Sequence, residues 1–268
     1  MNESEQVAGI SAARAYEGLH VPAMFLEWAG PMLEVIALRP GERFLDVACG
    51  TGVLAREASA RVGESGRVTG LDLDPGMLVV AAELAPAVIW KQGSAEALPF
   101  PEGSFDAVAC QFGLMFFPDP VATLREMARV LAPGGRIGVA VWDRLEHSPV
   151  YPRIVDLLEK NAGPEAAEAL RAPFGLGDRE KLETLFAEAG FESVTVETRM
   201  GTAHFPSLRS LMEAELRGWL PVMGVVLEEA RIRHILTEAE KALGDFVTAD
   251  GAFVFDTSAH LVTAGYSI

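Results

Sequence analysis

Short apolar runs and helical stretches alternate along the chain from residue 40 onward. The runs are rich in β-branched residues and predict strands at residues 43–48, 67–73, 87–92, 104–112 and 136–142. Apolar positions at helical spacing predict helices at residues 53–61, 75–84 and 120–131. Because strands separated by helices form right-handed crossover units, this part of the chain predicts a parallel, doubly wound α/β sheet.

The pattern changes after residue 142. A helix at 178–189, ended by Gly190, is followed by a strictly alternating strand at about 192–200. A last strand is predicted at about 252–266. The simplest fold is therefore a seven-stranded, mostly parallel sheet with helices on both faces.

Two helical segments lie outside this sheet pattern. The first 38 residues form a helical lead, which we expect to be interrupted at Pro22 and Pro31. Residues 207–243, between the last two strands, form a helical insertion with interruptions expected at Gly218, Pro221 and Gly224.

Composition and charge restrict the class of protein. The 268 residues are 50% hydrophobic and carry a net charge of −16, which disfavours sequence-independent binding of nucleic acid. No uncharged run approaches the about 18 apolar residues of a membrane span, and the polar, acidic N-terminus is unlike a secretory signal. Cys49 and Cys110 follow apolar runs, as reduced core thiols do. We expect a soluble, cytoplasmic protein.

A glycine-rich turn ends the first predicted strand, in the segment FLDVACGTG at residues 44–52. Such a turn opens the next helix and leaves backbone N–H groups facing a ligand. Asp72 follows 20 residues after Gly52, at the end of the second strand, where a carboxylate accepts both hydroxyls of a ribose. The turn also fits the dinucleotide fingerprint G-x-G-x-x-A. Asp46 opposes a pyrophosphate but favours an ammonium group, so a nucleoside with a cationic tail is preferred.

Four segments in order resemble the class I S-adenosylmethionine-dependent methyltransferases of the ubiquinone/menaquinone C-methyltransferase-like type (methyltransferase type 11). They are FLDVACGTG at 44–52, VTGLDLDPGML at 68–78, GSAEALPFPEGSFDAV at 93–108 and REMARVLAPGGR at 125–136. The resemblance covers roughly residues 40–142 and implies a Rossmann-like fold that binds S-adenosyl-L-methionine and releases S-adenosyl-L-homocysteine. It implies a cofactor-binding core at residues 39–142, with residues 1–38 as a lead and lid. Residues 143–268 would complete the sheet and carry the lid insertion.

The resemblance also implies roles for individual residues. The methionine moiety would be held by Asp46, Ala48, Gly50 and Gly52, with Gln111 near the sulfonium and the carboxylate. Asp72 would bind the ribose, and Tyr16 would close over the cofactor. The adenine would contact Leu73, Met77, Ser94, Ala95 and Glu96. Ala48 replaces the usual first glycine and Ser94 the usual aspartate, so the adenine contact loses charge assistance.

Methyl transfer is an in-line displacement whose leaving group needs no acid. Proximity and orientation supply much of the barrier reduction, and a base matters only for a hydroxyl, an ammonium or an acidic carbon. The sequence shows no unmistakable base and no metal cluster of the HExxH or CxxC kind. His147, in the loop after the fifth strand, is the candidate catalytic base, although loop histidines are usually only solvated.

The acceptor is expected to be a small apolar or aromatic molecule under a lid of residues 1–38, 143–176 and 207–243. These segments carry Phe25, Trp28, Met32, Tyr151, Phe174, Phe205, Trp219 and Met223. Glu213 and Arg217 also lie on the insertion, and the run LMFF at 114–117 belongs either to the pocket or to the core.

Two other functions stay open at this point. A nicotinamide-dependent oxidoreductase would use the same glycine turn, although Asp46 and the turn Leu98-Pro99-Phe100 are evidence against it. A catalytically silent S-adenosylmethionine-binding protein would carry the same motifs. Transfer to oxygen, nitrogen or carbon is equally open.

Overall fold

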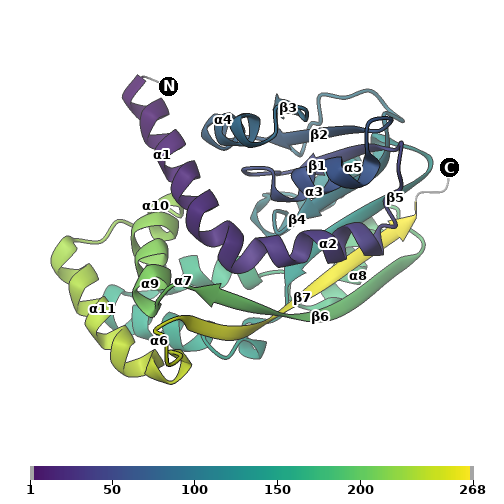
Figure 1. The fold of residues 1–268 in the computed structure, drawn as a ribbon. Coiled ribbons are helices and arrows are strands. Elements are labelled where there is room, and N and C mark those ends of the chain that lie inside the picture. The colour runs from purple at the N-terminus through teal and green to yellow at the C-terminus, as the bar shows by residue number, and fades with distance from the viewer. Residues whose placement is uncertain (1–2, 266–268) are drawn as a thin grey trace.

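A seven-stranded sheet with helices on both faces forms the centre of the protein (Figure 1). The structure is a computed structural model and describes residues 3–265. The strands are β1 (Arg43–Val47), β2 (Arg67–Asp72), β3 (Ile89–Gln92), β4 (Phe105–Gln111), β5 (Leu131–Trp142), β6 (Val194–Phe205) and β7 (Phe253–Gly265). Their order is β3-β2-β1-β4-β5-β7-β6, and only β7 runs antiparallel to both of its neighbours. The predicted Rossmann-like α/β fold is confirmed.

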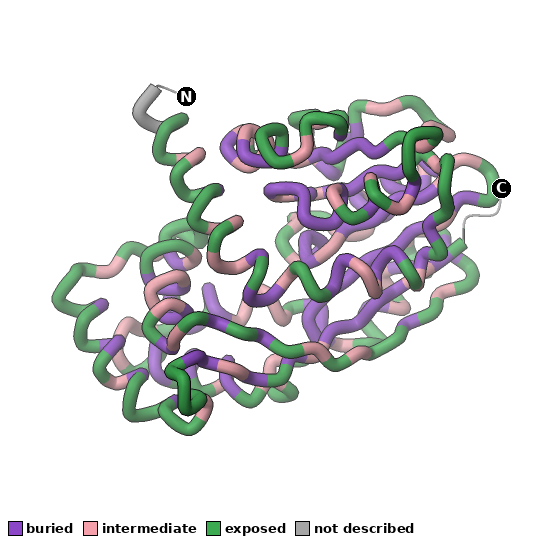
Figure 2. Tube along the Cα trace, in the orientation of Figure 1, coloured by how far each residue is buried: buried purple, intermediate pink, exposed green. Residues whose placement is uncertain are grey.

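The main helices are α1 (Glu3–His20), α2 (Leu26–Val35), α3 (Val53–Val62), α4 (Pro75–Leu84), α5 (Pro120–Arg129), α6 (Tyr151–Ala162), α7 (Pro164–Arg171), α8 (Arg179–Glu188), α9 (Leu208–Ala214), α10 (Leu220–Val222) and α11 (Glu229–Leu243). Helices α2 and α3 contribute to the apolar cluster on one face of the sheet. Helices α5 and α8 contribute to the cluster on the other face. Buried segments run along the strands between these layers (Figure 2).

The register of the parallel strands places the ligand-binding edge. Val47 of β1 pairs with Leu71 of β2, and Asp46 pairs with Ala109 of β4. The carboxyl ends of these strands therefore meet at one edge of the sheet, where open α/β sheets bind ligands.

The helical lead bends at only one of its two predicted interruptions. Pro22 lies in the π-helical turn η1 (Val21–Phe25), which joins α1 to α2. Pro31 lies inside α2 without ending it, contrary to the expectation. Trp28, Met32 and Leu33 on the same helix are almost completely buried, and this packing outweighs the lost hydrogen bond of Pro31.

The strand predicted at about 192–200 runs on to Phe205, because β6 pairs with β7 as far as Phe253. Tyr266, the last residue of the strand predicted at 252–266, lies outside the described residues, as do the first two residues of the lead.

The insertion joins the ends of this β6–β7 ribbon and packs with α6 and α7 at one end of the sheet (Figure 1). Gly218 lies in the π-helical turn η5 (Glu215–Trp219), and Pro221 lies in α10. The clear break comes at Gly224, whose φ of +81° ends the helix before α11 begins.

Candidate active site

A cavity of about 720 Å³ lies at the carboxyl edge of the sheet, between the turn after β1 and the helices of the insertion. We call one part the cofactor end; it is lined by Asp46, Ala48, Gly50, Met77 and Gln111. The other part, the lid end, is lined by Leu170, Pro173, Phe174, Glu213, Glu215, Arg217, Trp219 and Val222. Tyr16, His20 and Phe25 of the helical lead also line this cavity.

The turn after β1 adopts left-handed backbone conformations at three positions. Ala48, Gly50 and Gly52 have φ values of +55°, +54° and +86°. Glycine adopts these angles without strain, but alanine does not. Space for the Ala48 side chain exists because Gly113 has none: a Cβ at Gly113 would lie 2.8 Å from the Ala48 Cβ. The replacement of the usual glycine at position 48 is therefore accommodated, at the expense of local strain.

Asp46 is a buried carboxyl group at the cofactor end, with 1% of its surface exposed. Its Oδ2 accepts a hydrogen bond of 3.0 Å from the backbone N–H of Ala55 in α3. Burial, with a smaller contribution from the nearby Asp72 charge, raises the pKa of Asp46 to about 8. A cationic group beside it would restore the ionised form, so this position favours an ammonium ligand.

Gln111 adds a second acceptor at the same end. Its Nε2 donates to the carbonyl of Phe25 over 3.1 Å. Its Oε1 is buried and has no hydrogen-bond partner among the described residues. A buried amide oxygen without a partner is unfavourable, and a donor on a bound ligand would satisfy it. Together with Asp46, this acceptor fits the amino group of the expected cofactor better than its carboxylate, beside which the resemblance put Gln111.

Asp72 ends β2 and orders the two neighbouring loops. Its Oδ2 accepts from the N–H of Gly50 over 2.8 Å, and its Oδ1 accepts from the N–H of Asp74 over 2.9 Å. Burial raises the pKa of Asp72, while these two hydrogen bonds oppose the shift. Asp74 in turn caps α4 by accepting a hydrogen bond of 2.7 Å from the N–H of Gly76.

The helical lead is fastened to the cofactor end. Glu17 accepts a hydrogen bond of 2.5 Å from Thr51 Oγ1 and pairs with Arg56 at 2.8 Å. Tyr16 lies one residue away on α1, and a Cβ at Gly50 would come within 3.8 Å of its ring. Burial, followed by the nearby charge of Asp72, raises the pKa of the Tyr16 hydroxyl. Helix α1 thus covers the glycine turn.

The predicted cofactor residues divide into two groups. Those that line the cavity are Tyr16, Asp46, Ala48, Gly50, Met77 and Gln111. Those that do not are Gly52, Asp72, Leu73, Ser94, Ala95 and Glu96. Most of the second group follow β2 or β3: Leu73 is 69% exposed, and Ser94 Oγ accepts from the N–H of Glu96 over 3.2 Å.

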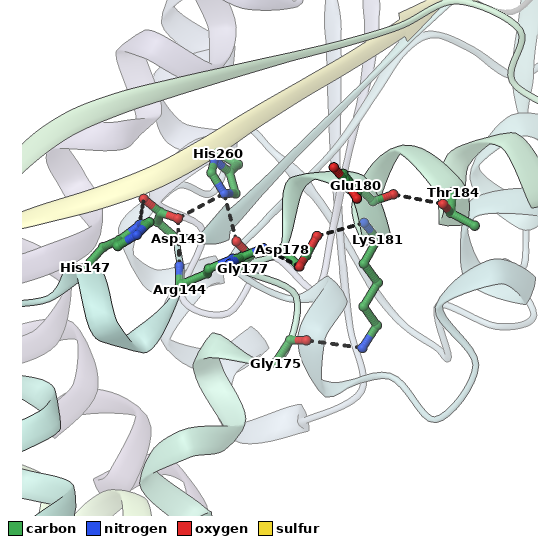
Figure 3. Close-up of polar contacts among 10 residues, drawn as sticks. All are labelled: Asp143, Arg144, His147, Gly175, Gly177, Asp178, Glu180, Lys181, Thr184 and His260. Atoms are coloured by element: carbon green, nitrogen blue, oxygen red, sulfur yellow. Dashed lines mark hydrogen bonds and ion pairs between the residues drawn. The ribbon is translucent and has the colours of Figure 1, made fainter.

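His147 lies apart from this cavity. Its Nδ1 is 2.9 Å from Oδ2 of Asp143, whose carboxylate also contacts His260 Nε2 at 3.1 Å (Figure 3). Ser258 Oγ donates to the same carboxylate over 2.8 Å. The pocket beside His147 measures about 20 Å³, which is room for about one water molecule. The role of His147 as a base stays a prediction, and the structure does not bring it to the cofactor end.

The aromatic and methionine residues of the predicted lid also divide. Phe25, Tyr151, Phe174 and Trp219 line the cavity, whereas Trp28, Met32 and Phe205 are core residues. Within the LMFF run, Leu114 is fully buried and Phe116 lines the cavity beside Trp219, with ring centroids 5.2 Å apart. The core prediction is therefore correct for Leu114, and the pocket prediction is correct for Phe116.

Sequence reasoning missed several polar residues of the cavity, among them His20, Glu215 and the hydroxyl group of Tyr151 as a hydrogen-bond donor. The sequence pattern contains a signal that could have identified Glu215. It stands four positions after Leu211, on the face of the segment that also carries Met212 and Leu216, all of them buried. A carboxylate on such an apolar face calls for an explanation.

Comparisons with known proteins agree with this geometry. The model of the methyltransferase domain family matches residues 45–139. The chain is 34% identical over 193 residues to the ubiquinone/menaquinone biosynthesis C-methyltransferase UbiE of Cronobacter sakazakii, covering 65% of this chain and 76% of that protein. It is 32% identical over 209 residues to the demethylmenaquinone methyltransferase of Lactococcus lactis, covering 71% and 82%. The solved structure of the YcgJ protein from Bacillus subtilis shares the fold, with a TM-score of 0.60 at 21% identity over 90% of this chain and 99% of that one.

These relatives favour a methyltransferase over a nicotinamide-dependent oxidoreductase or a silent binding protein. Within residues 3–265, no helix combines the length and the apolar character needed to cross a membrane. The chain belongs to the S-adenosylmethionine-dependent methyltransferases of the ubiquinone/menaquinone C-methyltransferase-like type.

Proposed function

We propose that the enzyme methylates a small aromatic acceptor of the phenol or quinol class, bound at the lid end of the cavity. The observation that carries this proposal is one continuous cavity with two chemically different ends. Acidic and amide groups line the cofactor end, and mainly apolar and aromatic side chains line the lid end. The names of two relatives, which refer to ubiquinone and menaquinone, support an acceptor of the quinone type.

At the cofactor end we assign Asp46 and Gln111 to the amino group of the cofactor and Asp72 to its ribose hydroxyls. The backbone around Ala48, Gly50 and Gly52 would hold the methionine moiety. The adenine would lie near Leu73, Met77, Ser94, Ala95 and Glu96. When bound, S-adenosylmethionine supplies an electrophilic methyl group, and its sulfur takes the electron pair of the broken bond.

The chain's own contribution is to position the acceptor and to exclude water. Phe116 and Trp219 pack against each other and form an aromatic wall of the cavity. Trp219 is fixed by a 2.8 Å hydrogen bond from its Nε1 to the carbonyl of Ala169. Helix α1 covers the other end through Glu17. Enclosure of this kind holds the two reactants in the orientation for in-line displacement. We propose that residues 1–38, 143–176 and 207–243 act together as this lid over the core at 39–142.

Calorimetric titration with S-adenosylmethionine, S-adenosylhomocysteine and NADH tests the cofactor assignment. Both sulfur nucleosides should bind at micromolar concentration, while NADH should not. Formation of S-adenosylhomocysteine with a naphthol as trial acceptor then tests the acceptor class. Trp219→Ala should weaken naphthol binding about tenfold and leave S-adenosylmethionine binding unchanged. Tight NADH binding, or equal loss of both ligands in Trp219→Ala, would contradict the proposal.

We further propose that the protein works in the cytoplasm on a small molecule and not on nucleic acid. Its net charge of −16 opposes contact with phosphate backbones. Cys49 and Cys110 are buried and free, as in proteins of reducing compartments.

A further inference from the structure

The lid end contains a buried carboxyl group that cofactor binding does not use. Glu215 begins the π-helical turn η5 and is 4% exposed, yet it lines the cavity. Its Oε1 accepts a hydrogen bond of 3.0 Å from the hydroxyl of Tyr151, at the start of α6. Single π-helical turns inside helices occur frequently at functional sites. A buried carboxylate is costly unless a ligand, a counter-charge or a proton compensates its charge.

The charged neighbours of Glu215 do not neutralise it. Arg217 lines the same end but forms a bidentate pair with Glu229 of α11, at 2.7 and 2.8 Å. Glu213 of α9 pairs with Arg209 at 2.9 Å. Within residues 3–265, no cation forms a salt bridge with Glu215.

The remaining groups around the chamber are uncharged. His20 of α1 is held neutral, since burial lowers its pKa to about 4. The hydroxyl of Tyr151 stays protonated because burial raises its pKa. Burial also raises the pKa of Glu215 to about 7, and the hydrogen bond from Tyr151 partly opposes this shift. A carboxyl group with that pKa exchanges protons readily near neutral pH.

We propose that Glu215 is the general base that accepts the proton of a hydroxyl group on the acceptor, an inference that rests on the proposed function. The O–H bond of the acceptor breaks, its proton forms a new O–H bond with the Glu215 carboxylate, and its electron pair stays on the acceptor oxygen. The acceptor thereby becomes the electron-rich nucleophile that methyl transfer requires. A hydroxyl is the group concerned because the proposed acceptor is a phenol or a quinol.

Tyr151 is the positioning residue of this pair. Its hydroxyl fixes one oxygen of Glu215 and its ring contacts Phe174, with centroids 5.1 Å apart. The other carboxylate oxygen then serves the acceptor.

The first test measures binding, with the enzyme saturated with S-adenosylhomocysteine. A naphthol and its methyl ether have nearly the same shape, but only the naphthol donates a proton. The wild-type protein should prefer the naphthol about tenfold or more. Because only ionised Glu215 accepts the hydroxyl proton, naphthol affinity should rise about tenfold between about pH 6 and pH 8, given the pKa of about 7. Binding of the ether should not change with pH.

Three variants test whether Glu215 is the group that accepts the proton of the acceptor. Glu215→Gln should bind the naphthol and its ether equally well, with an affinity that does not change with pH. Its binding of naphthol should release no proton, and its kcat should fall about 100-fold. Tyr151→Phe should move the pH dependence to higher pH, because the lost hydrogen bond lowers the Glu215 pKa in the wild type. Glu240→Gln, on the exposed surface of α11, is the matched control and should behave as wild type.

The outcomes separate this proposal from the one on which it rests. Equal binding of naphthol and ether, or an unchanged pH dependence in both Glu215→Gln and Tyr151→Phe, would overturn the role of Glu215 alone. Failure of both probes to bind to a protein that binds S-adenosylhomocysteine would overturn the proposed acceptor class.

Discussion

The backbone N–H of Gly50 donates a hydrogen bond of 2.8 Å to Oδ2 of Asp72 and so ties the glycine turn to the end of β2. The other oxygen of the same carboxylate orders the loop that starts α4, through the N–H of Asp74. One side chain thus organises two loops at the place where the ribose is expected. An amide at position 72 keeps one acceptor oxygen and turns an NH₂ group toward the other backbone N–H, so it retains one of the two structural hydrogen bonds, whereas alanine retains neither.

Asp72→Asn should bind S-adenosylmethionine about 10- to 100-fold more weakly and lose less thermal stability than Asp72→Ala, because it keeps one of the two backbone hydrogen bonds. The amide oxygen still accepts from Gly50, but hydroxyl donors lose a charged acceptor. Asp72→Ala should lose affinity and thermal stability together. Calorimetry and thermal unfolding measure both properties. Asp74→Asn, which preserves the cap of α4, is the control, and unchanged affinity in Asp72→Asn would argue against the ribose assignment.

Proton exchange on cofactor binding should report the state of Asp46. With a pKa of about 8, its carboxyl group is mostly protonated near neutral pH. An ammonium group beside it favours the ionised form, so binding at about pH 7 should release up to about nine-tenths of a proton. Above about pH 8 the free amino group of the cofactor loses its own proton, and binding should take a proton up.

Calorimetry in buffers of different ionisation enthalpy measures this exchange directly. Asp46→Asn should show no release at about pH 7. The control is Asp106→Asn, which should behave as wild type. Asp106 lies near the start of β4, and its carboxylate pairs with Arg43 of β1. Identical heats in every buffer for the wild-type protein would show that Asp46 does not meet the ammonium group.

Ala48→Gly should stabilise the protein by roughly 0.5 to 1 kcal/mol, or raise its unfolding temperature by a few degrees. The left-handed φ of +55° strains alanine by about 1 to 2 kcal/mol. Relief of this strain is partly offset, because glycine has more conformational freedom in the unfolded chain and so stabilises the unfolded state. The same change at Ala82, exposed in the last turn of α4, should destabilise by about 0.5 to 1 kcal/mol. Destabilisation by Ala48→Gly would mean that the contact of the alanine methyl near Gly113 outweighs the strain.

Glu17→Gln should loosen helix α1. The charge-assisted contact with Arg56 is lost while an acceptor for Thr51 remains, so S-adenosylmethionine should bind about 3- to 10-fold more weakly. Hydrogen exchange over residues 3–20 should accelerate in the variant. Glu83→Gln, which breaks the more exposed pair with Arg14, should change neither property appreciably. If both variants behave alike, the contact of Glu17 with the glycine turn has no special role.

Local patterns predicted the parts of the fold that depend on local chemistry. The segment at 44–52 predicted both a buried strand and the turn that follows it. Gly190 follows the end of α8 with a positive φ, as its position after the helix predicts. The helix predicted from residue 75 begins at Pro75, directly after the capping residue Asp74. The resemblance to a family then supplied the expected roles around these elements.

Features that depend on contacts between residues far apart in the chain could not be predicted from the sequence. Pro31 reads as a break, but burial of Trp28 and Met32 keeps α2 intact. The extension of β6 to Phe205 requires β7 as its partner. Glu215 and Tyr151 stand 64 positions apart in the sequence, so neither residue alone indicated the pair. His147 stands beside the predicted site in sequence, yet Asp143 directs it elsewhere.

The long β6–β7 ribbon has an evolutionary consequence. The insertion leaves the sheet after Phe205 and returns at Phe253, and these two residues are paired neighbours, both fully buried. A different segment could begin and end at these two adjacent anchors, provided that it also packs against α6 and α7 as the present insertion does. Such an exchangeable cassette allows selection to vary the acceptor chemistry of descendants while the half of the protein that binds the methyl donor is inherited unchanged.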